Sequence, residues 1–202
     1  PVFSRLHDQD NAEYQRLFSQ SVIVLLTITL PTTAFLGFWA SDWMGLIPGN
    51  DPISGAVLRI LSLTLNFSIL NTLLIIVFTS RNRQRWLILF SGGAVGVSFI
   101  TNWILIPLYA QAGAAYATLF SQVVLFGVMS IAVWRIFGIR FPLGKPLGIL
   151  AVCLFSGGIL YIIPGIPLLI IPPLFALLLF SSARISGVLT REEMQTMWKA
   201  VW

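Results

Sequence analysis

The stretch NWILIPLYAQAGAAYATLFSQ, from Asn102 to Gln122, decides how this chain is expected to fold. Two apolar runs flank a short polar break, and the second run opens with small residues instead of Leu. In lipid there is no water to expel from between helices, so association depends on close packing and small residues four apart mark contact faces. Such faces are predicted at Gly113, Ala117 and Ser121, with Ala114 and Thr118 beside them, and at Gly92 and Gly96. The second run is therefore predicted to be a helix packed closely against its neighbours.

The composition favours a lipid environment over water. Hydrophobic residues make up 57% of the 202 positions and charged residues 9%, whereas roughly 25% of the residues in a soluble domain are charged. A formal charge of +5 would suggest nucleic acid as the partner of a soluble chain, but the bases are placed as in a membrane protein, so no nucleic acid is expected. Because the chain starts at Pro1 without a signal-peptide pattern, we expect it to be the C-terminal part of a longer protein.

Six apolar stretches are long enough for membrane-spanning helices, since a bilayer core about 30 Å thick requires about 20 residues. They lie near residues 20–40, 54–79, 86–106, 112–134, 146–163 and 166–182. Pro172 and Pro173 predict a kink in the last span, or else a re-entrant hairpin with the fifth. The predicted fold is an all-α integral membrane protein with a six-transmembrane-helix bundle at 20–182.

The connections predict the orientation, because cytoplasmic loops accumulate Lys and Arg. The bases other than Arg59 all lie in the segment 1–19, the loops 80–86 and 135–145, or the tail 183–202. The remaining connections, 41–53, 107–111 and 164–165, contain no base. Six crossings therefore place both ends in the cytoplasm, and five would break the pattern.

Both ends of the chain carry signals of helices that lie along the membrane surface. Asp10-x-x-Glu13 and Thr190-x-x-Glu193 each resemble a capping box. Met194, Met197, Trp198 and Val201 then recur at amphipathic helical spacing. We expect residues 1–19 to form a cytoplasmic interfacial segment and residues 183–202 an amphipathic cytoplasmic tail.

The second predicted span holds the first candidate site residues, because polar side chains inside a membrane are costly and often functional. Arg59, Ser62 and Asn66 fall on one side of its helical wheel. Arg59 either snorkels to the outer headgroups or faces a water-filled cavity and attracts an anionic group, for which its planar fork suits phosphate. Asn66 and Asn102 are the other cavity candidates. Like Gln122, they either bind a sugar or phosphate or hold helices together.

Signatures of catalysis are missing from the sequence. Cys153 and His7 are the single cysteine and histidine, so no Ser/His/Asp or Cys/His set and no metal cluster can be assembled. No phosphate-cradling GxxxxGK[ST] loop is present. We expect neither enzymatic activity nor a cofactor or metal. Since no predicted span contains Asp or Glu in its interior, coupling to an ion through a membrane carboxylate would need a residue elsewhere.

Several segments of the chain resemble the C-terminal half of bacterial polysaccharide flippases. The segments are Pro1-Val-Phe-Ser-Arg-Leu, Ala40-Ser-Asp, Val57-Leu-Arg-Ile-Leu, Asn102-Trp-Ile-Leu-Ile-Pro-Leu-Tyr and Gly113-Ala-Ala-Tyr-Ala-Thr. These flippases are O-antigen and exopolysaccharide translocases of the multidrug/oligosaccharidyl-lipid/polysaccharide exporter superfamily. The chain departs from the pattern at Ala110, where a Gly often follows the Tyr, and at Asn50-Asp51-Pro52, which replaces a more usual aromatic.

The resemblance implies one lobe of a two-lobed, inverted-V carrier in the bacterial inner membrane. Its two lobes face a central cavity that opens alternately to each side and carries an undecaprenyl-diphosphate-linked oligosaccharide outward. Arg59 is the position onto which the family's basic cavity residues are carried over. The implied partners are this lipid-linked diphosphate, the membrane lipids and a missing N-terminal lobe.

Two other functions remain open at the level of the sequence. A multidrug or metabolite antiporter of the same superfamily should have a membrane carboxylate in the other lobe and a less basic cavity. A non-transporting membrane scaffold should have Arg59, Asn66 and Asn102 buried in helix contacts, with no accessible groove beside them.

Overall fold

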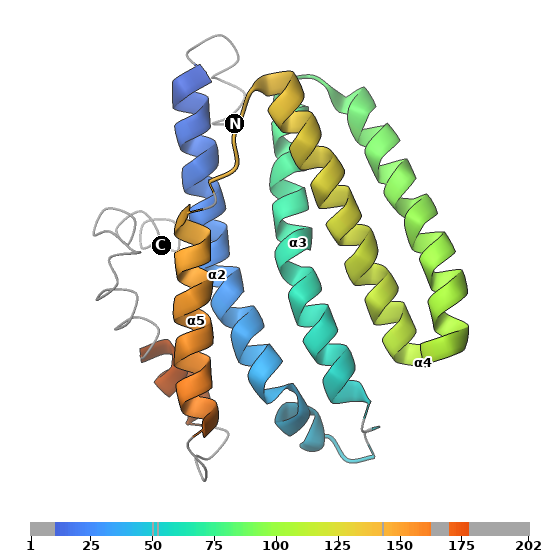
Figure 1. Cartoon of the computed structure of the whole chain (residues 1–202), viewed down its shortest axis with the longest axis vertical. Coiled ribbons are helices and arrows are strands. Elements are labelled where there is room, and N and C mark those ends of the chain that lie inside the picture. Colours follow the sequence, from blue (N-terminus) through green and yellow to red (C-terminus); the bar gives the residue numbers. More distant parts are fainter. Residues whose placement is uncertain (1–10, 50, 52, 143, 163–169, 178–202) are drawn as a thin grey trace. The chain divides into compact units, whose positions relative to one another are not determined.

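The computed structural model consists of helices joined by short connections in the part of the chain that it describes, with no strand there, as predicted (Figure 1). The described residues are 11–49, 51, 53–142, 144–162 and 170–177. The long helices are α2 (Asn11–Gly45), α3 (Ser54–Ser80), α4 (Gln84–Phe137) and α5 (Gly144–Ile162). Residues 171–177 form a further short helix, which makes five helices in these ranges.

Each long helix is long and apolar enough to cross a membrane. The predicted spans 20–40 and 54–79 lie within α2 and α3, and 146–163 matches α5 to within a residue or two at its ends. The predicted span 166–182 is described only at residues 170–177, so a count of six is not reached in the described residues. Pro172 and Pro173 lie in the first turn of that helical stretch, where the N–H that proline lacks has no partner within the helix.

The two predicted spans at 86–106 and 112–134 form the two arms of α4. The chain reverses direction between them (Figure 1), and Ala110 is the residue with non-helical backbone angles, φ 49° and ψ −122°. The sequence predicts a five-residue connection at 107–111, whereas the structure concentrates the reversal at Ala110. We call Gln84–Tyr109 the first arm and residues 111–137 the second arm.

Helix α2 begins earlier than the sequence predicts. Residues 11–19 are continuous with the span instead of forming a separate surface helix. The reason is that Tyr14 and Phe18, one turn apart, are both fully buried, and the Tyr14 hydroxyl is hydrogen-bonded to Ser80 Oγ at 2.8 Å. Residues 1–10 and the predicted tail at 183–202 lie outside the described residues.

The chain divides into two compact units. Unit 1 comprises Pro1–Val22 and Leu63–Phe141, and unit 2 comprises Ile23–Ser62 and Pro142–Trp202. Unit 1 thus contains the start of α2, most of α3 and both arms of α4. Unit 2 contains the rest of α2, the first turns of α3, all of α5 and the short helix at 171–177.

The core of unit 1 is built around Phe78, which is fully buried. Its ring contacts Phe90 of the first arm and Phe137 of the second, with centroids 5.7 and 5.5 Å away. Helix α3 ends just beyond it in a Schellman motif: Asn82 has a positive φ of 54°, and Arg83 N–H donates to the Phe78 carbonyl at 3.0 Å. The three helix ends therefore converge on one buried ring.

The predicted contact face on the second arm is confirmed, and the one on the first arm is not. Gly113, Ala117 and Ser121 are all buried. Gly113 lies so close to the first arm that an added Cβ would be 2.5 Å from the Leu105 carbonyl carbon. Gly92 and Gly96, by contrast, are exposed, and an added Cβ there would meet no described atom within 4 Å.

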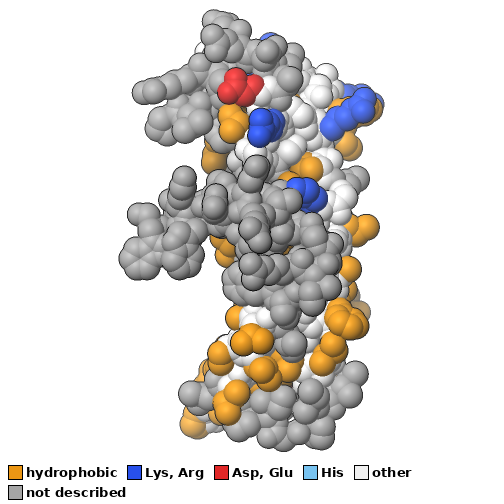
Figure 2. Space-filling model, turned by 90° about the vertical axis from the view of Figure 1, so that its left-hand side faces the viewer, with side chains coloured by type: hydrophobic (Ala, Val, Ile, Leu, Met, Phe, Trp, Pro, Cys, Tyr) orange, Lys and Arg blue, Asp and Glu red, His pale blue; other side chains and the backbone are white. Residues whose placement is uncertain are grey.

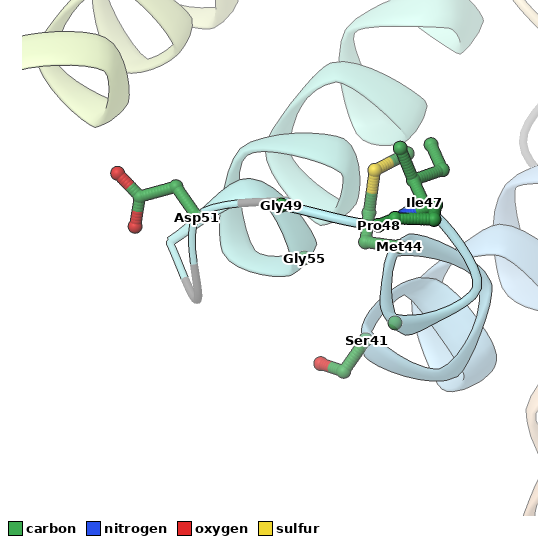
Figure 3. Close-up of a pocket in the computed structure, with 8 residues that line it drawn as sticks. Ser41, Met44, Ile47, Pro48, Gly49, Asp51 and Gly55 are labelled. Atoms are coloured by element: carbon green, nitrogen blue, oxygen red, sulfur yellow. The ribbon is translucent and has the colours of Figure 1, made fainter.

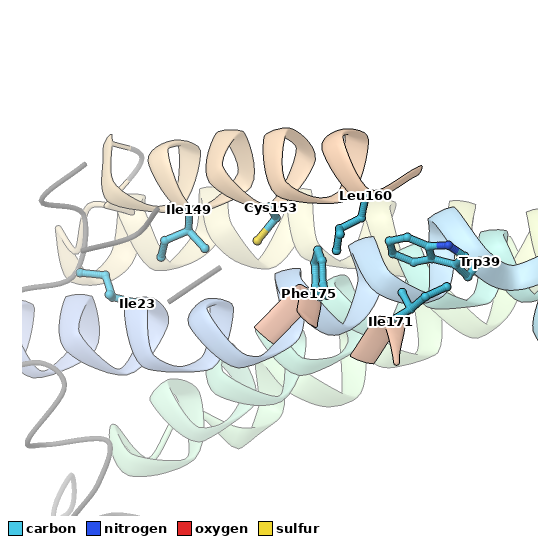
Figure 4. Close-up of a cluster of buried hydrophobic side chains, with 7 residues drawn as sticks. All are labelled: Ile23, Trp39, Ile149, Cys153, Leu160, Ile171 and Phe175. Carbon is cyan, nitrogen blue, oxygen red and sulfur yellow. The ribbon is translucent and has the colours of Figure 1, made fainter. Parts of the chain in front are cut away.

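Unit 2 has its own apolar core (Figure 4). The buried cluster takes Ile23 and Trp39 from α2, Ile149, Cys153 and Leu160 from α5, and Ile171 and Phe175 from the short helix. Gly157 lets α5 approach α2 closely, since an added Cβ would lie 2.6 Å from Phe38 Cδ2. The single cysteine is therefore a packed hydrophobic residue of this core.

Candidate functional site

Arg59 lies on an exposed part of α3, within unit 2. Its Nη2 donates a hydrogen bond to Ser41 Oγ on α2 at 3.3 Å. No carboxylate forms an ion pair with Arg59 among the described residues, and the bond to Ser41 uses only one of the several N–H donors of the guanidinium. The side chain is thus held at one edge and retains donors for an anionic ligand.

Ser41 reaches Arg59 because α2 changes direction just before it. Trp39 has non-helical angles, φ −106° and ψ 17°, and its buried ring contacts Phe35 and Phe175 at 5.5 and 6.0 Å. This aromatic packing fixes the point at which the helix bends. The residues that follow, including Ser41, are carried toward the start of α3.

Gly55 sets the distance between Ser41 and α3. A Cβ on Gly55 would lie 2.8 Å from Ser41 Oγ and 2.9 Å from Ser41 Cα, contacts too short for a Cβ atom. Only glycine therefore allows this approach. The hydrogen bond between Arg59 and Ser41 therefore depends on Gly55, which has no side chain of its own to take part in it.

A pocket of about 450 Å³ opens at the same corner (Figure 3). Ser41, Gly45, Gly49, Asp51 and Gly55 line it, together with Met44, Ile47 and Pro48. The Asp51 carboxylate accepts a hydrogen bond from Ile53 N–H at 3.0 Å, and so it is engaged in starting α3. The wall of the pocket thus combines the Ser41 hydroxyl, which accepts a hydrogen bond from Arg59, with backbone at three glycines.

The other two candidate residues lie in unit 1. Asn66 is 8% exposed, so it is closed to bulk solvent within the described residues. Asn102 is half-buried, and its Nδ2 donates to the Ser98 carbonyl at 2.8 Å and to Ser98 Oγ at 3.2 Å, both on its own helix. Arg59 belongs to unit 2, so the structure does not bring the three candidate residues together in one site. Their assignment to a common cavity stays a prediction.

Gln122 takes part in a bond between helices. Asn71 Nδ2 on α3 donates to Gln122 Oε1 at 2.7 Å and to the Gln122 carbonyl at 3.1 Å. Of the two roles that the sequence leaves open for Gln122, the structure therefore supports interhelical bonding. Within the described residues, no group of acidic, His or Cys side chains is arranged to hold a metal ion.

Sequence reasoning missed Ser41 and Gly55 as partners of Arg59. Ser41 stands in the Ala40-Ser-Asp segment of the resemblance, which gave it no role, and Gly55 lies one turn before Arg59. A glycine one turn from an isolated base in an apolar helix is the signal that could have found them. No protein-family model, curated protein or solved structure matches this chain.

Proposed function

We propose that this chain is the C-terminal lobe of a bacterial flippase that moves an undecaprenyl-diphosphate-linked oligosaccharide to the outer leaflet for cell-surface polysaccharide synthesis. The observation that carries the proposal is the exposed Arg59, held by Ser41 beside a pocket and paired with no described carboxylate. A planar, permanently charged guanidinium recognises phosphate oxygens through paired hydrogen bonds. Arg59 is thus the group that binds the diphosphate.

The resemblance to flippases adds independent support, because its most specific segments coincide with the reversal of α4. Asn102 and Pro107 lie in the first arm before the reversal, and Gly113 packs on the backbone of Leu105 just after it. These residues explain a fold feature of the lobe. They do not bear on the substrate. The proposed diphosphate substrate rests on Arg59.

In this proposal the four long helices supply five spans across the inner membrane, two of them the arms of α4, and the stretch 166–182 supplies the sixth, with both ends in the cytoplasm. The lobe rocks against a second lobe so that a midplane cavity opens alternately to each side, as in other transporters built from repeated bundles. The corner that holds Ser41 and Arg59 then belongs to the outer side. Arg59 binds the diphosphate on its way to the outer leaflet.

Orientation can be measured by cysteine labelling in a Cys153→Ala background. Arg83→Cys should react with an impermeant reagent only from the cytoplasmic side, and Ile47→Cys only from the outside, since both positions are exposed. Labelling of both from one side would contradict the proposed layout.

The transport role is tested by Arg59→Ala and Arg59→Lys in the complete protein, in the bacterium that carries it. Arg59→Ala should lower glycan export at least tenfold, given the roughly 1.5–3 kcal/mol of a charged hydrogen bond, whereas Arg59→Lys, which keeps the charge, should retain part of it. Lys145→Ala removes an exposed base elsewhere in unit 2 and is the matched control. Unchanged export by Arg59→Ala at normal protein level would refute the role.

A scaffold function has one observation in its favour, the burial of Asn66. The same export measurement separates it from transport, because a scaffold would tolerate loss of the Arg59 charge.

Ser41→Ala should lower glycan export less than Arg59→Ala does, since it leaves the guanidinium present but removes the hydroxyl that holds it.

A further inference from the structure

Unit 1 carries a concentration of positive charge at the point where its helix ends meet. The arginines in its described residues are Arg16, Arg81, Arg83, Arg85, Arg135 and Arg140. Glu13 is the one acidic residue there, and no ion pair joins it to any of these arginines within the described residues. All of them except Arg81 are exposed. We call this set the basic end of unit 1.

Direct contacts connect two of the segments that carry these arginines. The Gln15 side chain pairs with the backbone of Arg140 in both directions, donating from Nε2 at 2.6 Å and accepting at Oε1 at 2.9 Å. Phe18 packs edge-on against Phe141 at 5.7 Å. The start of α2 is thereby fixed to the segment after α4, so Arg16 and Arg140 belong to one surface.

Arg81 is the fixed member of the basic end. Its guanidinium lies 4.3 Å from the centroid of the Tyr14 ring and 5.8 Å from that of Phe137. Its Nε is buried and makes no hydrogen bond to any described residue. Stacking on aromatic faces attracts the cation but does not neutralise it. A positive charge is therefore held in place between α2 and α4.

Aromatic side chains of amphipathic character stand next to the exposed arginines. Trp86 directly follows Arg85 in the first arm, and Trp134 directly precedes Arg135 in the second; the two indoles are 40% and 55% exposed. Indole rings prefer the headgroup region of a bilayer, where one edge is apolar and the other wet. Among the side chains coloured by type in Figure 2, the charged ones lie in the upper half of the view and hydrophobic ones predominate in the lower half.

We propose that the basic end of unit 1 is a docking surface for acidic phospholipid headgroups. The inference uses the proposed membrane placement but not the transport role of Arg59. Acidic lipids supply the anions that balance these arginines, for which the described part of unit 1 offers Glu13 as its one acidic residue. The adjacent Trp residues match the depth of the headgroups. Because the surface is assembled from α2, the α3–α4 loop and the end of α4, a bound headgroup stabilises the packing of these segments in unit 1.

The proposal is tested on the purified full chain in neutral detergent, with the thermal unfolding midpoint as the measurement. Added phosphatidylglycerol should raise the midpoint in a saturable, salt-sensitive way, whereas phosphatidylcholine and inorganic phosphate at equal concentration should not. The triple variant Arg83→Gln, Arg85→Gln, Arg135→Gln changes only exposed side chains. The phosphatidylglycerol concentration for half of the shift should rise on the order of 100-fold in this variant, at about 1 kcal/mol per arginine near the surface.

Two further variants separate the possible outcomes. The corresponding triple Lys variant keeps the charge and should respond like the wild type. Arg59→Gln, at the other end of α3, should also keep the lipid response, so that failure of the lipid test and failure of the export test remain distinguishable. An equal response of the triple Gln variant, a shift produced by inorganic phosphate alone, or an equal shift with a short RNA would each overturn the proposal.

Discussion

The two arms of α4 are both long apolar helices, yet the structure treats their small residues in opposite ways. On the second arm Gly113, Ala117 and Ser121 are buried in contacts. On the first arm Gly92 and Gly96 are exposed, and the apolar neighbours Ile88 and Phe99 are 76% and 67% exposed. Spacing of small residues shows where a helix can be approached closely. The path of the chain then determines which of these faces meets a neighbour.

The difference follows from the reversal at Ala110 together with the position of α3. The reversal presses the start of the second arm against Leu105 at Gly113. Farther along, α3 lies against the second arm, where Phe67 and Phe126 stack edge-on at 5.8 Å. The second arm thus has a neighbour along much of its length. The glycine face of the first arm has none among the described residues.

The largest expected effect comes from Gly113→Ala. The added Cβ would clash with the Leu105 backbone, which has no flexible end that can move away. We expect a loss of about 3 kcal/mol of stability, the upper end of the range for overpacking, measured as a lowered thermal midpoint in detergent.

Gly127→Ala is the matched control in the same arm, since an added Cβ there meets no described atom within 4 Å. It should leave the midpoint unchanged or raise it slightly, as expected from helix propensity. Equal behaviour of the two variants would mean that the arms are not in contact at Gly113.

The reversal itself could be predicted from the sequence, because a short polar break separates two apolar runs around Pro107 and Gln111. The residue at which the chain reverses is Ala110, which is also a position where the chain departs from the flippase pattern. Ala110 stands where a Gly is common, and the structure gives Ala110 a positive φ of 49°. An L-residue with a Cβ is strained in that conformation, whereas glycine adopts it readily.

Ala110→Gly should therefore stabilise the hairpin by about 1 kcal/mol. This is the net of two effects: the backbone strain at Ala110 is relieved, and the unfolded chain gains conformational freedom from glycine. The thermal midpoint should rise. Ala112→Gly, two residues later in regular helix, supplies the comparison and should lower the midpoint by a similar amount. A fall in both variants would show that the reversal does not lie at Ala110.

A smaller effect is expected from the polar bond that anchors the second arm to α3. Asn71 and Gln122 should show a coupling free energy of about 0.6 kcal/mol in a double-mutant cycle of Asn71→Ala and Gln122→Ala, typical of hydrogen bonds between membrane helices. The measurement is the thermal midpoint of the two single variants and the double variant. If the effects of the two single substitutions simply add in the double variant, the Asn71 and Gln122 side chains are not coupled and the bond between them is contradicted.

The candidate site was less accessible to sequence reasoning than the helices. Arg59 is conspicuous because it is the one base outside the basic connections. Its partner Ser41 is brought near by the bend at Trp39 and by the missing side chain of Gly55. Both are tertiary effects that leave no periodic trace. For the same reason the sequence did not indicate that burial of Tyr14 and Phe18 would extend α2 in the N-terminal direction, beyond the predicted span.

The smallest expected effect is at Gly92. With nothing within 4 Å of an added Cβ, Gly92→Ala should raise the thermal midpoint slightly, by about 0.5 kcal/mol in stability, because alanine loses less conformational freedom than glycine in a helix. Replacement of glycine by alanine is thus expected to have opposite signs at Gly113 on the second arm and at Gly92 on the first. A drop in the midpoint, or weaker assembly of the complete protein at normal expression, would mean instead that the face of Gly92 and Gly96 packs against a helix of the assembled protein. The two arms would then differ only in where their neighbours come from.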